Sequence, residues 1–258
     1  MVCLKGRLGN GGVPCVSAVE LECYARDMIY DFDVDLLTRP CPVDMERMLE
    51  CYMQANLEIR SITPDQSILG VTMFNGGEVP IYCGDKGEYR ALRMPPRTVL
   101  IDRQLAEGIS PGRFRFTMAH EAAHLACHAQ VRLSSGGLCR ESNGGAMFMC
   151  RTSDIAKSEE GRKEKTPEQW LEWQADYLAG AILMPARTIY SAVDIYLQQL
   201  GMDLNAASWK EMLSRREPKA WITRYISYVF KVSIQAASVR LITLCRHYPL
   251  RSILEGRP

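Results

Sequence analysis

The most constraining feature of the sequence is the segment Phe114 to Gln130, which contains neither glycine nor proline and follows the pair Ser110-Pro111. Serine followed by proline is a typical start of an α-helix, so we expect one helix through this segment. It carries the histidines at 120, 124 and 128. Residues four apart share one face of a helix, so these side chains project from the same side.

The motif His120-Glu121-Ala-Ala-His124 places two imidazoles and a carboxylate within a wedge of about 100° on this helix. Zinc peptidases use this arrangement, with two histidines as metal ligands and the glutamate as a base beside the metal. The alternative is a helix whose histidines are exposed or hydrogen-bonded in the core. A third ligand would decide between the two interpretations, because a catalytic zinc takes three protein ligands.

Two residues are candidates for the third ligand. His128 lies about 12 Å along the helix axis from His120, with no glycine or proline between them, so we expect it behind the ligands or in the core. Glu172 is the better candidate, because it lies in an apolar helix expected at 166–184, where Thr166 and Gln169 predict a capping box at the start. Asp176, one turn later, can accept a hydrogen bond from the outer nitrogen of a ligating histidine.

Two stretches around these residues closely resemble the ImmA/IrrE family of bacterial metallopeptidases. They are Phe116-Thr-Met-Ala-His-Glu-Ala-Ala-His-Leu-Ala-Cys-His128 and Glu172-Trp-Gln-Ala-Asp-Tyr-Leu-Ala-Gly-Ala-Ile-Leu-Met-Pro185. With similar features at 97–102 and 230–241, the resemblance covers roughly 95–245. It implies that His120, His124 and Glu172 bind Zn²⁺, that Glu121 is the catalytic base and that Asp176 supports a ligand.

The resemblance also implies a zincin-like α+β fold and an endopeptidase whose protein substrate is a helix-turn-helix transcriptional repressor. The chain departs from the family in Ala122-Ala123, where Leu-Gly is common, and in a longer linker before Glu172. This linker, an insertion at 133–165, is therefore a candidate cover for the cleft. The reaction also needs an oxyanion donor, and sequence spacing does not choose among the candidates Arg187, Tyr190 and His247.

Apolar runs upstream predict a small, mainly antiparallel sheet that packs on the motif helix. Runs at 57–62, 68–74, 79–83 and 98–101 are typical of strands, and Asn75-Gly76-Gly77 predicts a hairpin between the second and third. We expect three regions along the chain. They are a loose segment and helix at 1–40, the metallopeptidase domain at 41–200 and a helical, helix-turn-helix-like segment at 201–258.

The C-terminal segment supports a competing interpretation, a zinc-stabilised transcription regulator that binds DNA or a regulatory partner without proteolysis. We expect helices at 221–230 and 234–245 around a tight turn, with Ser233 as the N-cap of the second helix. An apolar seam is expected along that helix, at Ile234, Ala237, Leu241 and Leu244. The range 216–258 holds eight basic residues against two acidic ones. Against DNA binding, the second helix offers only Gln235, Ser238 and Arg240 to read bases. Lys231 also occupies the turn, where glycine is usual.

Composition excludes several other classes. The 31 basic and 30 acidic residues give a net charge of +1, so no overall charge indicates a nucleic-acid or membrane-surface protein. The ten cysteines form no Cys-x-x-Cys pair and fall below the roughly 8–10% of a disulfide scaffold. No uncharged run approaches the about 20 apolar residues of a membrane span. We therefore expect a cytoplasmic protein with reduced thiols and no membrane partner.

Overall fold

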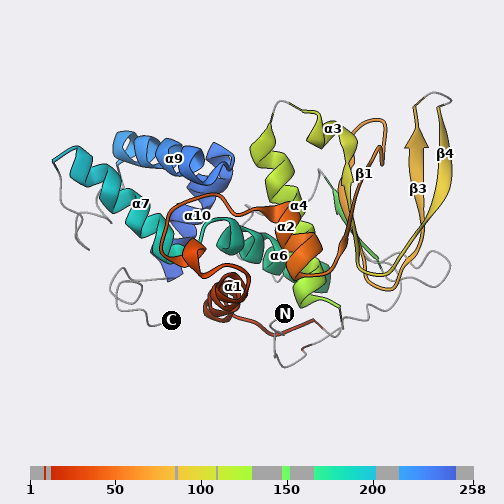
Figure 1. Ribbon diagram of the computed structural model, residues 1–258, viewed down its shortest axis with the longest axis horizontal. Helices are drawn as coiled ribbons and strands as arrows, with labels where there is room; N and C mark the ends of the chain where they lie inside the picture. The colour runs from red at the N-terminus through yellow and green to blue at the C-terminus, as the bar shows by residue number, and fades with distance from the viewer. Residues whose placement is uncertain are drawn as a thin grey trace. The chain divides into compact units, whose positions relative to one another are not determined.

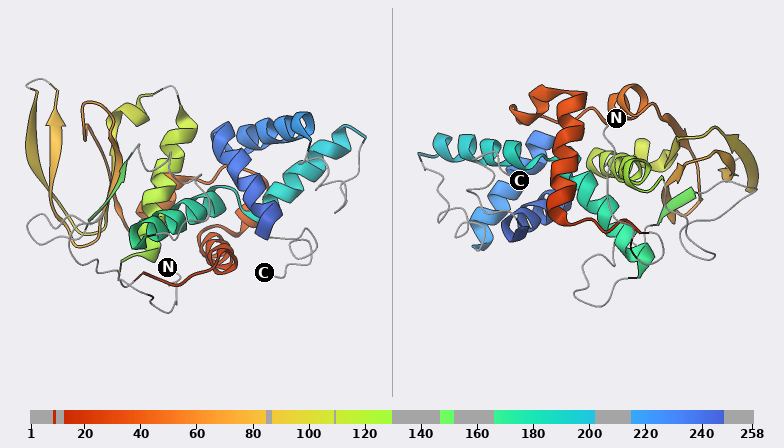
Figure 2. Two further views of the ribbon diagram at one scale, coloured as in Figure 1. Left: turned by 180° about the vertical axis from the view of Figure 1, so that it is seen from behind. Right: turned by 90° about the horizontal axis from the view of Figure 1, so that it is seen from below.

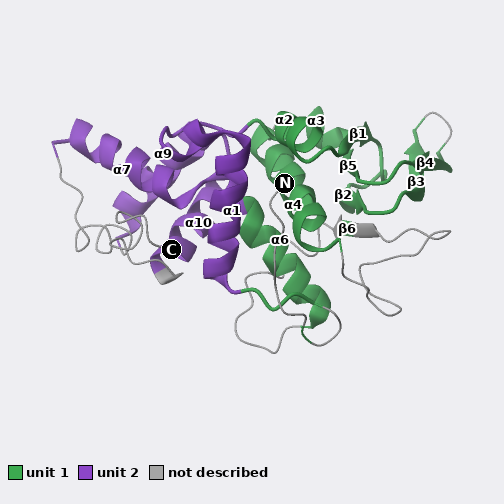
Figure 3. Ribbon diagram, turned by 60° about the horizontal axis from the view of Figure 1, so that its bottom comes forward, with its two compact units in different colours: residues 1, 3–16, 44–179 green, residues 2, 17–43, 180–258 purple. Residues whose placement is uncertain are grey.

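The computed structural model describes residues 9, 13–84, 87–108, 110–129, 147–151, 166–201 and 215–247. The chain divides into two compact units (Figure 3). Unit 1 comprises residues 1, 3–16 and 44–179, and unit 2 comprises residues 2, 17–43 and 180–258. All strands of the described residues belong to unit 1, so the protein is of mixed α+β class. Unit 2 gathers helices that the sequence analysis distributed over three regions.

The main sheet of unit 1 has four strands in the order β1-β5-β2-β6. β1 and β5 pair in parallel, whereas β2 pairs antiparallel with both β5 and β6. A separate antiparallel pair joins β3 and β4. The bounds are β1 Asn56–Arg60, β2 Ile68–Met73, β3 Gly77–Cys83, β4 Glu88–Met94, β5 Thr98–Asp102 and β6 Met147–Arg151. The expectation of a small, mainly antiparallel sheet is therefore confirmed.

The expected hairpin at Asn75-Gly76-Gly77 is wrong, because β2 and β3 belong to different sheets. Gly76 has a φ of 74°, and a Cβ there would lie 2.9 Å from the carbonyl oxygen of Met94, so glycine is required at this turn. The Asn-Gly-Gly signal correctly indicates a local turn, but it does not pair the strands on either side of it. β2 pairs with β6 and β3 pairs with β4, and neither β4 nor β6 was expected from the sequence. β4 is almost wholly exposed and lacks an apolar run, and β6 lies inside the expected insertion at 133–165.

Both faces of the main sheet are covered within unit 1. Helix α4, Pro111–Cys127, lies on one face, and the β3–β4 pair lies on the other (Figures 1 and 2). An apolar core fills the space between the two sheets, formed by Ile62, Val71, Met73, Val79, Ile81, Met94, Leu100 and Met149. Because side chains alternate along a strand, Gly70 and Thr72 of β2 face α4 instead. Both residues meet Glu121 there.

Helix α6 of unit 1, Pro167–Leu183, lies where the sequence predicts a helix. It starts with the expected capping box, in which the Gln169 amide donates to Thr166 Oγ1 at 3.3 Å and the Thr166 amide donates to Gln169 Oε1 at 3.0 Å. The remaining elements are α2 Met45–Arg47, its π-helical continuation Met48–Tyr52, and α3 Arg103–Ala106. Residues 13–16 differ from the expected loose lead-in, since Val13 and Val16 are buried.

Unit 2 is helical in its described residues. It contains α1 Ala18–Phe32, a 3₁₀ turn at Val34–Leu37, α7 Ala186–Gln199, α9 Arg216–Phe230 and α10 Ile234–His247. α9 and α10 meet at 112°, with Lys231 in the left-handed conformation and the Ala236 amide donating to Ser233 Oγ at 3.0 Å. The expected turn and cap are thus confirmed. Ile234 departs from the expected apolar seam, because it is 56% exposed.

Among the described residues, no single helix has both the length and the apolar character needed to cross a membrane. Two bent pairs of helices reach the required length and composition only when each pair is counted together.

Candidate metal centre

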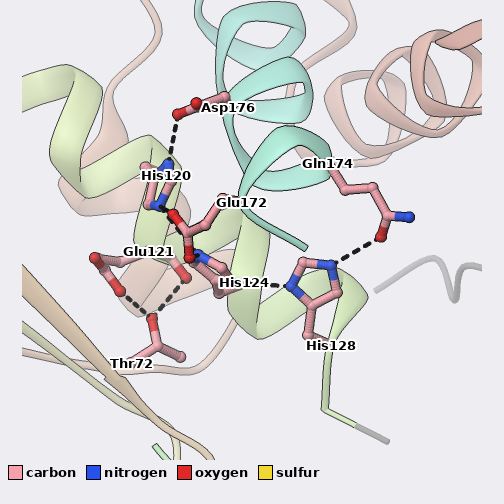
Figure 4. Close-up of polar contacts among 8 residues, drawn as sticks. All are labelled: Thr72, His120, Glu121, His124, His128, Glu172, Gln174 and Asp176. Carbon is pink, nitrogen blue, oxygen red and sulfur yellow. Dashed lines mark hydrogen bonds and ion pairs between the residues drawn. The ribbon is translucent and has the colours of Figure 1, made fainter. Parts of the chain in front are cut away.

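Two turns of α4 supply the first half of the site. His120 and His124 are both buried, and their Nε2 atoms lie 3.0 Å apart (Figure 4). The helix continues through them because Phe114 to Cys127 contains no residue that interrupts helical hydrogen bonding. The spacing of four residues then brings both rings to one side.

Glu172 of α6 completes the group. Its Oε2 lies 3.3 Å from Nε2 of His120, and its Oε1 lies 3.4 Å from Nε2 of His124. One ligand atom from each of the three residues lies within 4.8 Å of the others, and in the described part of the chain this group could hold a metal ion. The three residues proposed as ligands from the sequence are therefore brought together.

The outer nitrogen of His120 is held by Asp176. Asp176 Oδ1 lies 2.9 Å from His120 Nδ1, and a carboxylate only accepts, so Nδ1 carries the proton. This tautomer turns a lone pair of Nε2 toward His124 and Glu172. The side chain of Asp176 is 30% exposed, so the contact lies at the open margin of the site. The expected contact between Asp176 and a ligating histidine is present.

Charge at the centre favours a cation. Burial alone would raise the pKa of the Glu172 carboxyl, but when the two rings are protonated, the charge of His124 and the hydrogen bonds that both histidines then donate outweigh it and hold the pKa below its usual range. Glu172 is thus a carboxylate that draws positive charge to the facing ring nitrogens. A proton or a metal cation can supply that charge.

Glu121 lies beside this group, on the side of Thr72 (Figure 4). Burial raises the pKa of its carboxyl, although His120 and His124 oppose the shift. Its Oε1 has no hydrogen-bond partner among the described residues. A buried carboxyl oxygen without a partner is a typical feature of a reactive group.

Thr72 suits both protonation states of Glu121. Its Oγ1 lies 2.6 Å from Glu121 Oε2 and 3.0 Å from the main-chain oxygen of the same residue. The hydroxyl can donate to the carboxylate, or accept from the protonated carboxyl while donating to the main chain. Glu121 can therefore gain and lose a proton without losing this contact.

His128 is outside the metal-ligand group, as expected. It follows the last residue of α4, and its Nδ1 lies 2.9 Å from Nδ1 of His124. Burial lowers the pKa of His128 to about 3, with a further contribution from the charge of His124, so its ring is neutral. On its other side, Nε2 lies 3.0 Å from Oε1 of Gln174.

The oxyanion candidates remain predictions. Arg187 and Tyr190 belong to α7 of unit 2, where Arg187 is exposed and Tyr190 is buried. The side chain of His247 lies outside the described residues, as does the expected insertion apart from β6.

Sequence reasoning missed Gly70, Thr72 and Gln174. A Cβ at Gly70 would lie 2.5 Å from Oε1 of Glu121, so the strand needs glycine to make room for that carboxyl. Glycine inside a strand pattern is a known sign of such a close approach and could have been noticed. Thr72 and Gln174 carry no comparable signal, since each reads as an ordinary strand or helix residue.

Comparison with known proteins gives no family assignment. No family model matches the chain, and the curated proteins also yield no match. The motif resemblance to a metallopeptidase family therefore stays a prediction.

Proposed function

We propose that the protein is a zinc-dependent endopeptidase of the type that its motifs resemble, the ImmA/IrrE metallopeptidases. The observation that carries the proposal is the convergence of His120, His124 and Glu172, with Glu121 buried beside them. Two imidazoles and one carboxylate form the ligand set of a catalytic zinc with an open coordination position. A structural zinc site would instead be closed by a fourth protein ligand.

When bound, zinc would act as a Lewis acid on the peptide carbonyl and lower the pKa of a water molecule. Glu121 would take the proton of the attacking water and return it to the leaving amine. Its raised pKa suits a general base, because proton transfer is most efficient when the pKa lies near the working pH. Thr72 would hold the carboxyl in both states.

The substrate would lie along β6. Within the described residues β6 is the edge strand beside β2, which carries Gly70 and Thr72 next to Glu121. The other edge, β1, is separated from β2 by β5. An extended peptide can add to such an edge by main-chain hydrogen bonds. By motif resemblance, the substrate proposed is a helix-turn-helix repressor.

Two substitutions test this proposal. Glu121→Gln keeps the three ligands, so zinc content should stay near one per chain while peptidase activity falls about 10²–10⁴-fold. Glu172→Ala should abolish both zinc retention and cleavage. Glu168→Gln, which changes an acidic residue of α6 outside the metal group, is the matched control. Peptidase activity in the Glu121→Gln protein would contradict the proposed base, and zinc retained by Glu172→Ala would contradict the third ligand.

The second candidate is a DNA-binding regulator, and the 112° angle between α9 and α10 favours it. Against it, Arg240 is buried and ion-paired with Glu22, so one of three expected base-reading residues faces the protein interior. Binding to DNA through phosphates should weaken steeply with salt. Derepression that persists in cells with Glu121→Gln, without repressor cleavage, would favour the regulator over the peptidase.

A further inference from the structure

A chain of hydrogen-bonding groups leads from His124 away from the metal centre to the main chain near the N-terminus. Nδ1 of His124 lies 2.9 Å from Nδ1 of His128, and Nε2 of His128 lies 3.0 Å from Oε1 of Gln174 (Figure 4). Nε2 of Gln174 then donates to the carbonyl oxygen of Pro14 at 2.6 Å. His128, Gln174 and this carbonyl are here called the His128 relay. His128, Gln174 and Pro14 are all buried, and all three belong to unit 1.

The direction of every hydrogen bond in the relay follows from the carbonyl of Pro14. A carbonyl only accepts, so the amide NH₂ of Gln174 must face it and Oε1 of Gln174 must face His128. That oxygen also only accepts, so Nε2 of His128 carries a proton. The ring is fully buried and faces a neutral amide on this side, where a second proton would place an unpaired charge in the interior, so it holds only this one. Nδ1 of His128 is then an acceptor, and Nδ1 of His124 must donate to it. His124 therefore turns a lone pair of Nε2 toward His120 and Glu172.

We propose that His128 and Gln174 are positioning residues that fix the tautomer and ring orientation of His124 for metal binding. This inference rests on the proposed metal centre but does not require peptidase activity. It makes Pro14 part of the support of the site, since its carbonyl sets the direction of the whole relay. Outer partners of ligating histidines generally act in this way.

The two histidines are supported by different chemistry, and their burial explains why. Asp176 holds His120 at the open margin, where a carboxylate remains partly solvated. His128 and Gln174 are fully buried, and an additional carboxylate there would bear a large desolvation cost. A neutral relay orients His124 without placing another charge in the interior.

Long-range ¹H–¹⁵N correlation spectra of the metal-free protein test the direction of the relay. We expect His128 as the Nε2–H tautomer in the wild type. Gln174→Met removes both polar atoms of Gln174 and should shift His128 toward the Nδ1–H tautomer. Leu178→Met alters a buried side chain of the same helix but keeps every hydrogen-bonding group of the relay, so it should leave the tautomer unchanged. A wild-type His128 protonated on Nδ1 would overturn the proposal.

Zinc titration tests the positioning role. We expect Gln174→Met to weaken zinc binding about 10–100-fold relative to Leu178→Met, as is typical for the outer partners of metal ligands. His128→Asn keeps an acceptor beside His124 whereas His128→Leu does not, so the asparagine variant should bind zinc more tightly. Equal affinity of these two variants, or wild-type affinity in Gln174→Met, would overturn the role. Wild-type protein with the expected tautomer but no zinc binding would instead refute the metal centre itself.

Discussion

The two units each bury a polar cluster, and the clusters differ in how their charges are matched. In unit 2, Arg240 pairs with Glu22 and donates from Nε to the carbonyl oxygen of Met184 at 3.0 Å, so opposite charges face each other. In unit 1, two ring nitrogens and the carboxylate of Glu172 face one another, with their lone pairs directed inward. The first cluster contains its own cation, whereas the second could hold one. This difference separates an interaction that stabilises a fold from a group that could bind a metal.

The largest effect is expected when one partner of the Arg240–Glu22 pair in unit 2 is removed. Arg240→Met leaves the carboxylate of Glu22 buried without its cation, so the free energy of unfolding should fall by about 3–5 kcal/mol. Urea denaturation measures the loss, and Arg224→Met, an exposed position on α9, should change stability by no more than about 0.5 kcal/mol. Folded Arg240→Met protein should still bind zinc. Loss of zinc binding in that folded protein would show that the two clusters are coupled.

If the second cluster binds zinc, adding zinc should stabilise unit 1. A ligand that binds only the folded state stabilises it by about 2.7 kcal/mol at a free concentration 100 times the Kd. Zinc should therefore raise the Tm of the wild-type protein, and chelation should reverse the shift. The same zinc addition should leave the Tm of Glu172→Ala unchanged. An equal Tm shift in both proteins would place the binding elsewhere.

Gly70→Ala tests whether the space beside the candidate metal centre is required. Its Cβ would lie 2.5 Å from Oε1 and 2.8 Å from Cγ of Glu121, so the carboxyl must move. We expect a stability loss of about 1–3 kcal/mol, typical of overpacking, together with lower peptidase activity. Gly84→Ala is the control, because a Cβ there meets only a ring carbon of Tyr82 at 4.0 Å. Full activity of Gly70→Ala would show that Glu121 has room to shift without loss.

The smallest effect expected is a pH dependence at Glu121 in the metal-free protein. Its pKa is raised in the folded state above the usual value of 4.5, so the folded protein holds a proton that the unfolded chain releases. Stability from this group is complete below that value and is lost as the pH rises. The wild type should therefore lose up to about 1.4 kcal/mol per pH unit relative to Glu121→Gln. Parallel stability curves for the two proteins, measured with chelator present, would contradict the raised pKa.

Short-range patterns carried most of the correct sequence predictions. The capping box of Thr166 and Gln169 and the turn before Ser233 depend on residues within a few positions of each other. The same holds for His120 and His124, whose spacing alone puts them on one helix face. Glu172 lies far from the histidines in the sequence and was chosen because its helix is apolar and carries Asp176 one turn later. The structure brings both acidic residues to the site.

Long-range pairing explains what the sequence analysis missed or misjudged. The hairpin at Asn75-Gly76-Gly77 failed because β6, far along the chain, pairs with β2. Gly70 and Thr72 gained their roles only when α4 packed on the sheet. A glycine inside a strand signals a close approach, but no local pattern tells which residue approaches Gly70 or that Thr72 would meet the same side chain.

Which side chains could form the candidate centre follows from the sequence alone, because helical periodicity sets which residues share a face of a helix. The tertiary structure decided the direction of their hydrogen bonds. Gln174 and Pro14 are 160 positions apart, yet the carbonyl of Pro14 orients the amide of Gln174 and, through His128, the ring of His124. A ring nitrogen is a donor or an acceptor only in relation to its neighbour, and folding alone supplies that neighbour.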